Sequence, residues 1–271
     1  MLVHTTSYNY IENYLERQQA RGKYSFTTDE LRNQFKVLPE TLVKAIQRLK
    51  KKGKIAQVRQ EFYVIVTPEY SNRGILPAWN YVDDLMKYLN RNYYVGLLNA
   101  AAIHGAAHQQ PQDFYVISER PYLRDIKNKK IIIHFSIKKE WDKKDIIDKK
   151  TETGYVKVSS PELTALDLVF FQVNIGGLSR LATLLEELAE SIDPSKLAET
   201  AKRYGQITTV QRLGFMLENV VNHKEKVEPM YEWLEKKDYF PVLLQPGKKS
   251  KNKKVNNRWK IVKNASPQSD L

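Results

Sequence analysis

The chain has 271 residues, of which 42% are hydrophobic and none is cysteine, and its formal net charge at pH 7 is +13. This hydrophobic fraction excludes a wholly disordered protein, and the lack of cysteine excludes disulfides and thiolate metal sites. The sequence has neither a run of 18 apolar residues nor the apolar core of a signal peptide, so we expect a soluble cytoplasmic protein.

The positive charge is concentrated at the two ends of the sequence. Residues 1–70 hold 12 Lys and Arg against 7 Asp and Glu, and residues 244–271 hold 8 against 1. Residues 71–243 are nearly balanced, with 24 against 23. This distribution favours a polyanionic partner, because cations that neutralise phosphates release condensed counterions. A basic protein that is merely soluble would have the same composition.

The first 53 residues predict three helices in succession. Residues 9–21 have the apolar spacing of an amphipathic helix. Thr27 and Glu30, three positions apart, form the capping-box pattern that opens a second, short helix. Pro39 suits the first position of a third helix, because no intrahelical bond needs its missing N–H there, and Gly53 ends that helix.

The third helix has two unlike faces, and a basic hairpin with Arg59 near its tip is expected over residues 54–66. One face is apolar, with Leu42, Ala45, Ile46 and Leu49, and the opposite face carries Thr41, Lys44, Arg48 and Lys51. This arrangement is typical of a winged helix-turn-helix, which lays its basic helix in the major groove of DNA. We therefore predict DNA contacts from Thr41, Lys44, Gln47, Arg48, Lys51 and Arg59. The alternative is an ordinary solvated helix face in a module used for protein contact.

The remaining sequence predicts a larger second domain. Residues 71–78 have the Gly, Pro and Ser composition of a linker, which places a DNA-binding domain over 1–70 and a second domain over 79–271. In the second domain we expect helices over 79–90, 94–103, from 161, 178–189, 194–204, 208–221 and 229–236. Strands are expected over 114–118, 130–137 and 155–158, with 239–244 and 258–262 as a basic C-terminal hairpin. The predicted fold class is therefore α/β mixed (α+β).

Two patterns could indicate an enzyme or a metal site. His104 and His108 are four residues apart, but no third ligand at suitable spacing supports a metal ion. Asp113, Asp125 and Lys127 loosely resemble the acidic pair and lysine of restriction-type nucleases. The sequence has no glycine-rich phosphate loop and no Gly-x-Ser-x-Gly elbow, so we expect no cofactor, no metal and no catalysis. A metal-dependent nuclease and a transcription regulator with a sensing domain stay open as alternatives.

A low-complexity basic run covers residues 248–254. Such a run is most often a solvated loop. If it is functional, it would add attraction to nucleic acid without adding sequence information.

Several segments of the second domain resemble the AbiEi-family antitoxins of bacterial abortive-infection systems. These segments are residues 93–98, 101–105, 110–117, 155–168, 176–178 and the closing Arg258-Trp259. The resemblance extends over roughly residues 24–262, and a winged N-terminal module in front of these segments is the arrangement that such proteins have.

The resemblance implies a specific function. AbiEi-like proteins are the antitoxins of type IV toxin–antitoxin systems, which act in phage defence and are encoded beside a nucleotidyltransferase-like toxin. The resemblance further implies autoregulation, in which the winged module binds inverted repeats cooperatively and represses the operon. The C-terminal domain would counteract the toxin without a stable complex. The family supplies no catalytic residue to transfer, and two copies on one inverted repeat are expected.

Overall fold

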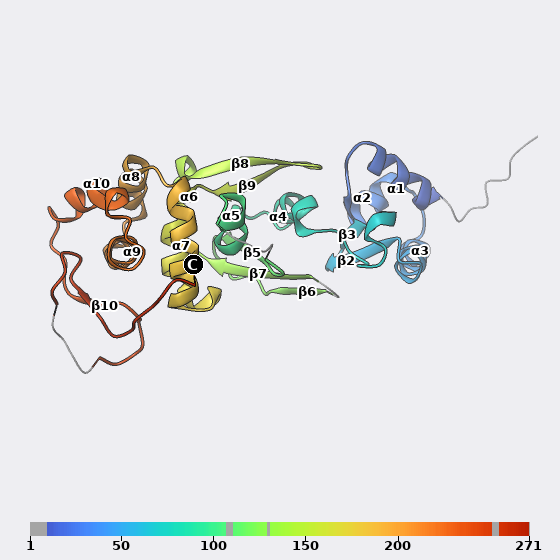
Figure 1. The fold of residues 1–271 in the computed structure, drawn as a ribbon. Coiled ribbons are helices and arrows are strands. Elements are labelled where there is room, and N and C mark those ends of the chain that lie inside the picture. Colours follow the sequence, from blue (N-terminus) through green and yellow to red (C-terminus); the bar gives the residue numbers. More distant parts are fainter. Residues whose placement is uncertain (1–9, 107–110, 129–130, 251–254, 271) are drawn as a thin grey trace, which may run out of the picture. The chain divides into compact units, whose positions relative to one another are not determined.

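The computed structural model describes residues 10–106, 111–128, 131–250 and 255–270 (Figure 1). It shows a mixed α/β fold, as predicted. The chain forms two compact units, the first from residues 1–93, 112–137 and 148–157, and the second from 94–111, 138–147 and 158–271. The chain thus passes between the units several times, and the domain division at residues 71–78 stays a prediction. Within the described residues, no helix has the length and apolar character needed to cross a bilayer.

The first unit begins with three helices and a small antiparallel sheet (Figure 1). The helices are α1 (Tyr10–Ala20), α2 (Thr28–Gln34) and α3 (Pro39–Lys51). The strands are β1 (Ser25–Thr27), β2 (Ile55–Arg59) and β3 (Phe62–Ile65), in the order β1-β3-β2. This succession is the one expected for a winged helix-turn-helix, and β2 is an edge strand of its sheet.

Local sequence signals explain where α2 and α3 begin. The hydroxyl of Thr27 accepts a hydrogen bond from the Glu30 backbone N–H at 3.1 Å, and the Glu30 carboxylate accepts one from the Thr27 N–H at 3.3 Å. This reciprocal pair is the predicted capping box. Pro39 is the first residue of α3, also as predicted. The module closes around a core in which α1, α2 and α3 contribute Ile11, Leu31 and Ile46, each at most 4% exposed.

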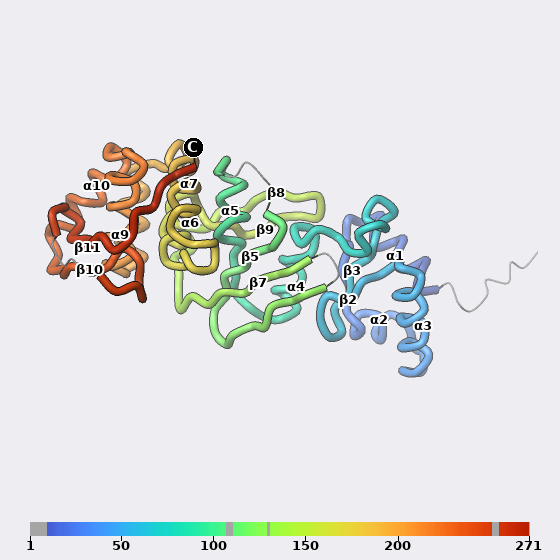
Figure 2. Tube along the Cα trace, turned by 60° about the horizontal axis from the view of Figure 1, so that its bottom comes forward, coloured from blue at the N-terminus to red at the C-terminus, as the bar shows by residue number. Residues whose placement is uncertain are grey.

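The rest of the first unit is built on a second sheet. Its strands are β5 (Phe114–Ser118), β6 (Ile126–Asn128) and β7 (Ile131–Ile137), and its helical segments are η1 (Pro68–Tyr70), η2 (Ala78–Asn80) and α4 (Val82–Tyr88). Strand β7 lies between a parallel β5 and an antiparallel β6, and Figure 2 shows β7 and β5 side by side. Ile75 and Leu76 are completely buried, so residues 71–78 pack against the unit although their composition is that of a linker.

Three strands contain residues of both units, namely β4 (Tyr93–Val95), β8 (Ile146–Thr151) and β9 (Gly154–Ser159). The sequence did not predict β8, whose residues are mostly exposed and lack the alternating pattern of a half-buried strand. Within the second unit, β4 pairs in parallel with β9 through Val95 and Val158.

The second unit is otherwise mainly helical. Its α-helices are α5 (Leu97–Ile103), α6 (Pro161–Phe170), α7 (Leu178–Leu188), α8 (Pro194–Tyr204), α9 (Ile207–Asn219) and α10 (Lys224–Leu234). Shorter 3-10 turns are η3 (Lys143–Asp145), η4 (Gln172–Ile175) and η5 (Ala189–Ser191). The predicted helix at Pro161 is confirmed, and Ser160 caps it by accepting a hydrogen bond from the Leu163 N–H.

Three sequence predictions in this unit were wrong. The helix expected over 94–103 begins only at Leu97, because Tyr94 and Val95 belong to β4. The helix expected from Pro229 begins at Lys224 and contains Pro229 in its interior, where the buried Val227 and Met230 anchor the helix to the core. The packing of these side chains therefore outweighs the tendency of proline to begin or interrupt a helix.

The third error concerns the C-terminal hairpin. Strands β10 (Val242–Leu243) and β11 (Ile261–Val262) pair in parallel, with Val242 opposite Ile261, and in Figure 2 they lie beside α9. A tight hairpin turn can join only antiparallel strands, whereas parallel strands need a long connection. Residues 244–260 supply such a connection.

Candidate nucleic-acid interface

Helix α3 separates its apolar and polar side chains as the sequence predicted. Leu42, Ile46 and Leu49 are at most 4% exposed and belong to the core of the N-terminal module. The predicted contact residues of this helix are all exposed: Thr41, Lys44, Gln47, Arg48 and Lys51. Helix α3 contains four cationic residues and one acidic residue, Glu40. Its solvent face is therefore positively charged.

Arg59 has a different environment from the residues of α3. It lies at the end of the edge strand β2 and is half-buried. Its guanidinium Nη1 donates to the backbone carbonyl of Arg124 at 3.5 Å. The predicted wing residue is thus held against another part of the first unit, in contrast to the exposed face of α3.

A groove of about 450 Å³ runs along β2 and contains cations from three elements. Lys50 of α3, Arg59 of β2 and Lys127 of β6 line it, together with Gln57 and Asn128. Lys50 Nζ donates to Gln57 Oε1 at 2.7 Å, and the side-chain amide of Asn128 donates to the Gln57 carbonyl. Sequence reasoning missed this groove, because β6 lies more than 60 residues beyond β2 along the chain and has no strong strand pattern.

The lysines at the end of α3 and just beyond it contact different partners. Lys52 and Lys54 pair with Glu12 of α1 at 3.0 and 2.6 Å, respectively. Hydrogen bonds from Lys54 and Lys52 lower the pKa of Glu12 below its ordinary value. Lys50 is bonded to Gln57, so Lys51 is the member of the run that continues the exposed face of α3.

The acidic residues of the nuclease alternative meet at a histidine. His134 Nδ1 lies 2.7 Å from Asp125 Oδ2, and His134 Nε2 lies 3.1 Å from Asp113 Oδ2. Burial alone lowers the pKa of His134, but the hydrogen bonds with Asp113 and Asp125 outweigh it and raise the pKa above its ordinary value. Both carboxylates are thus engaged by one imidazole. Among the described residues, no group of three or more His, Cys, Asp or Glu has an arrangement suited to a metal ion.

The predicted histidine pair is only partly visible. His104 Nε2 lies 2.7 Å from the carbonyl oxygen of Ser159, and the His104 carbonyl accepts a hydrogen bond from the Ser191 hydroxyl at 2.8 Å. His108 lies outside the described residues. His104 therefore connects α5 to β9 and η5 within the second unit.

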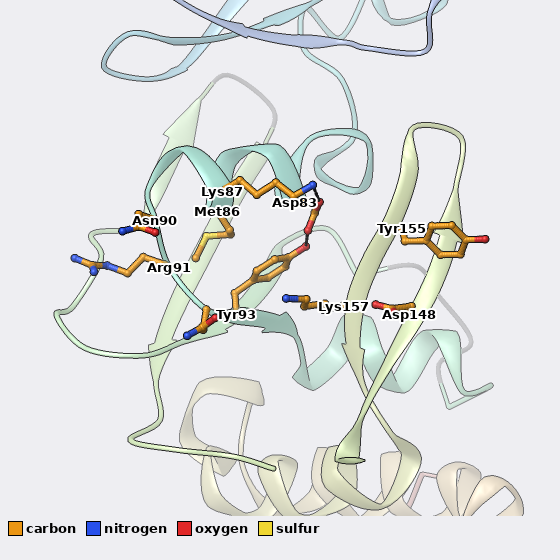
Figure 3. A pocket seen from close by; sticks show the side chains of 10 residues that line it. Asp83, Met86, Lys87, Asn90, Arg91, Tyr93, Asp148, Tyr155 and Lys157 are labelled. Atoms are coloured by element: carbon orange, nitrogen blue, oxygen red, sulfur yellow. Dashed lines mark hydrogen bonds and ion pairs between the residues drawn. The ribbon is translucent and has the colours of Figure 1, made fainter. Parts of the chain in front are cut away.

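A hollow of about 480 Å³ lies in the first unit beside α4 (Figure 3). The Tyr93 hydroxyl donates to Asp83 Oδ1 at 2.8 Å, and Lys87 Nζ lies 2.6 Å from Asp83 Oδ2. Burial, followed by the hydrogen bond with Asp83, raises the pKa of Tyr93 well above its ordinary value, so the phenol stays a donor. Asp83 is thus engaged by two groups of its own unit.

A buried carboxylate organises the second unit. Asp167 on α6 has no exposed surface and accepts three hydrogen bonds, from Tyr94 at 2.6 Å, Lys138 at 2.8 Å and Tyr204 at 3.0 Å. Burial and the Asp167 charge raise the pKa values of Tyr94 and Tyr204 well above the ordinary value. Both phenols therefore remain protonated, and Lys138 supplies the counter-ion. Below, these four residues are called the Asp167 cluster.

Residues 94–219 match the family model described as the AbiEi antitoxin C-terminal domain. This match confirms the family resemblance. The matched stretch contains the whole Asp167 cluster and begins beyond α1–α3 and α4. An AbiEi antitoxin domain supports an antitoxin role in a toxin–antitoxin system. No curated protein matches the chain.

Among solved structures, the chain is similar to the RV2827C protein from Mycobacterium tuberculosis, with a TM-score of 0.63. The similarity covers 96% of this chain and 90% of that chain at 14% sequence identity. At this identity the likeness shows the fold alone. Because it extends over nearly the whole chain, it includes the N-terminal module that the AbiEi domain match leaves out.

Proposed function

We propose that the chain is the antitoxin of a type IV toxin–antitoxin system and the DNA-binding autorepressor of its own operon. The exposed basic face of α3 is the single observation that carries the repressor half of this proposal. The AbiEi domain match and the resemblance drawn from the sequence support the antitoxin half.

Residues 10–66 act in this proposal as a winged helix-turn-helix on double-stranded DNA. Lys44, Arg48 and Lys51 supply charge for phosphates and guanine edges, while Thr41 and Gln47 hydrogen-bond to base edges. Arg59 enters a neighbouring groove or contacts the backbone after it releases the Arg124 carbonyl. Two copies bind the two halves of an inverted repeat cooperatively, since operator symmetry mirrors protein symmetry.

The same chain counteracts a nucleotidyltransferase-like toxin without a stable complex. This activity belongs to the AbiEi-like part of the chain and does not require the basic face of α3. The protein is not an enzyme in this proposal, needs neither metal nor cofactor, and acts in the cytoplasm. The alternative nuclease would need Asp113 and Asp125 on a metal ion, whereas both are hydrogen-bonded to His134. We therefore expect no magnesium-dependent cleavage of DNA.

The repressor half is tested with the full chain and a duplex from the promoter upstream of its gene. A Lys44→Ala, Arg48→Ala double variant should lose at least about tenfold in affinity at fixed salt, measured by fluorescence anisotropy. A Lys196→Ala, Lys224→Ala variant removes the same charge from exposed positions of α8 and α10, and it should bind nearly as well as the wild type. Equal affinity of both variants would refute the assignment of α3.

The antitoxin half is tested separately by growth rescue. A toxin gene directly beside the gene of this chain is the first expectation, and its presence would distinguish an antitoxin from a regulator with a sensing domain. The Lys44→Ala, Arg48→Ala variant should still protect cells that express that toxin. Loss of protection by this variant, with the control variant protective, would show that DNA binding and antitoxicity are not separate.

A further inference from the structure

Apolar side chains are exposed in the turn before α3 and in the first half of that helix. Val37, Leu38 and Val43 are 39%, 74% and 47% exposed. They are three of the five large aliphatic side chains that are exposed in the described part of the chain, the others being Ile147 and Val173. Single exposed aliphatic residues need no explanation. Three within seven residues, in the turn before α3 and in its first half, are an unusual concentration that suggests a binding role.

Val43 lies among the predicted DNA-contacting residues. It precedes Gln47 by four residues and Lys50 by seven, so these three side chains share one side of α3. Lys50 reaches Gln57 of β2 at 2.7 Å, and this side of α3 is therefore the one next to the hairpin. Lys44 follows Val43 directly in sequence and is exposed. Val43 is thus an apolar position on a cationic surface.

In helix-turn-helix proteins the N-terminal residues of the recognition helix contact the base edges. The major-groove edge of thymine carries a methyl group, which aliphatic side chains contact, whereas the other bases offer polar groups there. We propose that Val43 of α3, together with Leu38 and Val37 of the turn before the helix, recognises thymine methyl groups in the operator. This inference rests on the proposed DNA-binding function and adds the kind of base that the start of α3 selects.

Charge complementarity favours DNA as the partner of Val37, Leu38 and Val43, which are called the apolar strip from here on. Helix α3 has a net charge of +3, from four cations and one acid. A second copy docked through the same strip would bring these like charges together, which is unfavourable. A duplex instead offers phosphates to the surrounding lysines while its thymine methyl groups meet the strip.

The test replaces thymine by uracil, one position at a time, in the promoter duplex that the wild-type protein binds. Uracil pairs as thymine does but lacks the methyl group. At one or two positions in each half-site we expect affinity to fall about three- to fivefold, as the burial of one methyl group predicts. A Val43→Ala variant should bind the thymine duplex correspondingly more weakly and should no longer distinguish thymine from uracil at one of these positions.

The matched control is Val173→Ala, which truncates an exposed valine of η4 in the second unit and should keep the thymine preference. Tight binding of the promoter by the wild type with equal affinity for thymine and uracil at every position would overturn the inference but leave the repressor proposal intact. Absence of promoter binding would refute both. A change in sedimentation of Val43→Ala without any thymine preference would identify the strip as a contact between copies, and so would also overturn the inference.

Discussion

The Asp167 cluster and the basic face of α3 use charged side chains in opposite ways. Asp167 is completely buried and surrounded by three donors, whereas Lys44 and Lys51 extend into solvent from α3. The buried charges hold segments together that are far apart in sequence. The exposed charges contribute little to folding and are available for a partner. Buried charge in the second unit therefore has a structural role, whereas exposed charge on α3 forms the proposed binding surface.

The largest effect is expected when the buried Asp167 cluster is disrupted. Asp167→Asn keeps the size of the side chain but leaves the ammonium of Lys138 buried without its counter-ion. We expect the free energy of unfolding to fall by about 3–5 kcal/mol, measured by urea denaturation. The control Asp238→Asn changes an exposed carboxylate and should alter stability by less than about 0.5 kcal/mol. Similar small losses in both variants would contradict the structural role of the cluster.

A second prediction tests close packing in the same unit. A Cβ atom added at Gly214 of α9 would overlap the buried ring of Trp259. Alanine normally stabilises a helix relative to glycine by about 1 kcal/mol. Gly214→Ala should instead destabilise the protein by about 1–3 kcal/mol, because the added methyl group overpacks the core. Differential scanning calorimetry would measure the loss. Adding Trp259→Leu should make the combined loss smaller than the sum of the two single losses, and additive losses would argue against the predicted overlap.

The third prediction concerns the charge of His134, whose burial is intermediate between that of Asp167 and that of the exposed lysines of α3. Its pKa is raised in the folded state, so its contribution to stability is fully present below the unfolded pKa of about 6.5. That contribution is lost as pH rises through the higher folded pKa. The stability advantage of the wild type over His134→Gln should therefore be larger at about pH 5.5 than at about pH 8. An advantage that does not change with pH would contradict the ion pairs with Asp113 and Asp125.

The smallest effect on stability is expected for substitutions on the exposed basic face of α3. Lys44→Ala and Lys51→Ala should each change the free energy of unfolding by less than about 0.5 kcal/mol, because exposed side chains add little to stability. Each variant should nevertheless weaken promoter binding. It should also reduce the slope of log affinity against log salt concentration by about one, as expected for the loss of one phosphate contact. Substantial loss of stability in either variant would show that these lysines have a structural role.

Several elements of the fold were predictable because their signals are local. The capping box of Thr27 and Glu30, Pro39 at the start of α3 and the two faces of that helix depend on residues within one or two helical turns. The helices at 178–188 and 194–204 and the strand at 114–118 followed from apolar spacing in the same way. The family resemblance also came from contiguous strings of residues, and the AbiEi domain match confirmed it.

Other features required the tertiary structure because they join residues that are distant in sequence. Lys138 meets Asp167 across 29 residues and Tyr94 meets it across 73, and no local pattern indicates which charges pair inside a core. The parallel β10–β11 pair and the groove between β2 and Lys127 likewise depend on the path of long connections. The sequence by itself determined the helix caps, the faces of α3 and the resemblance to AbiEi antitoxins. Only tertiary packing decided which polar groups are buried together, because burial depends on neighbours that the chain brings in from afar.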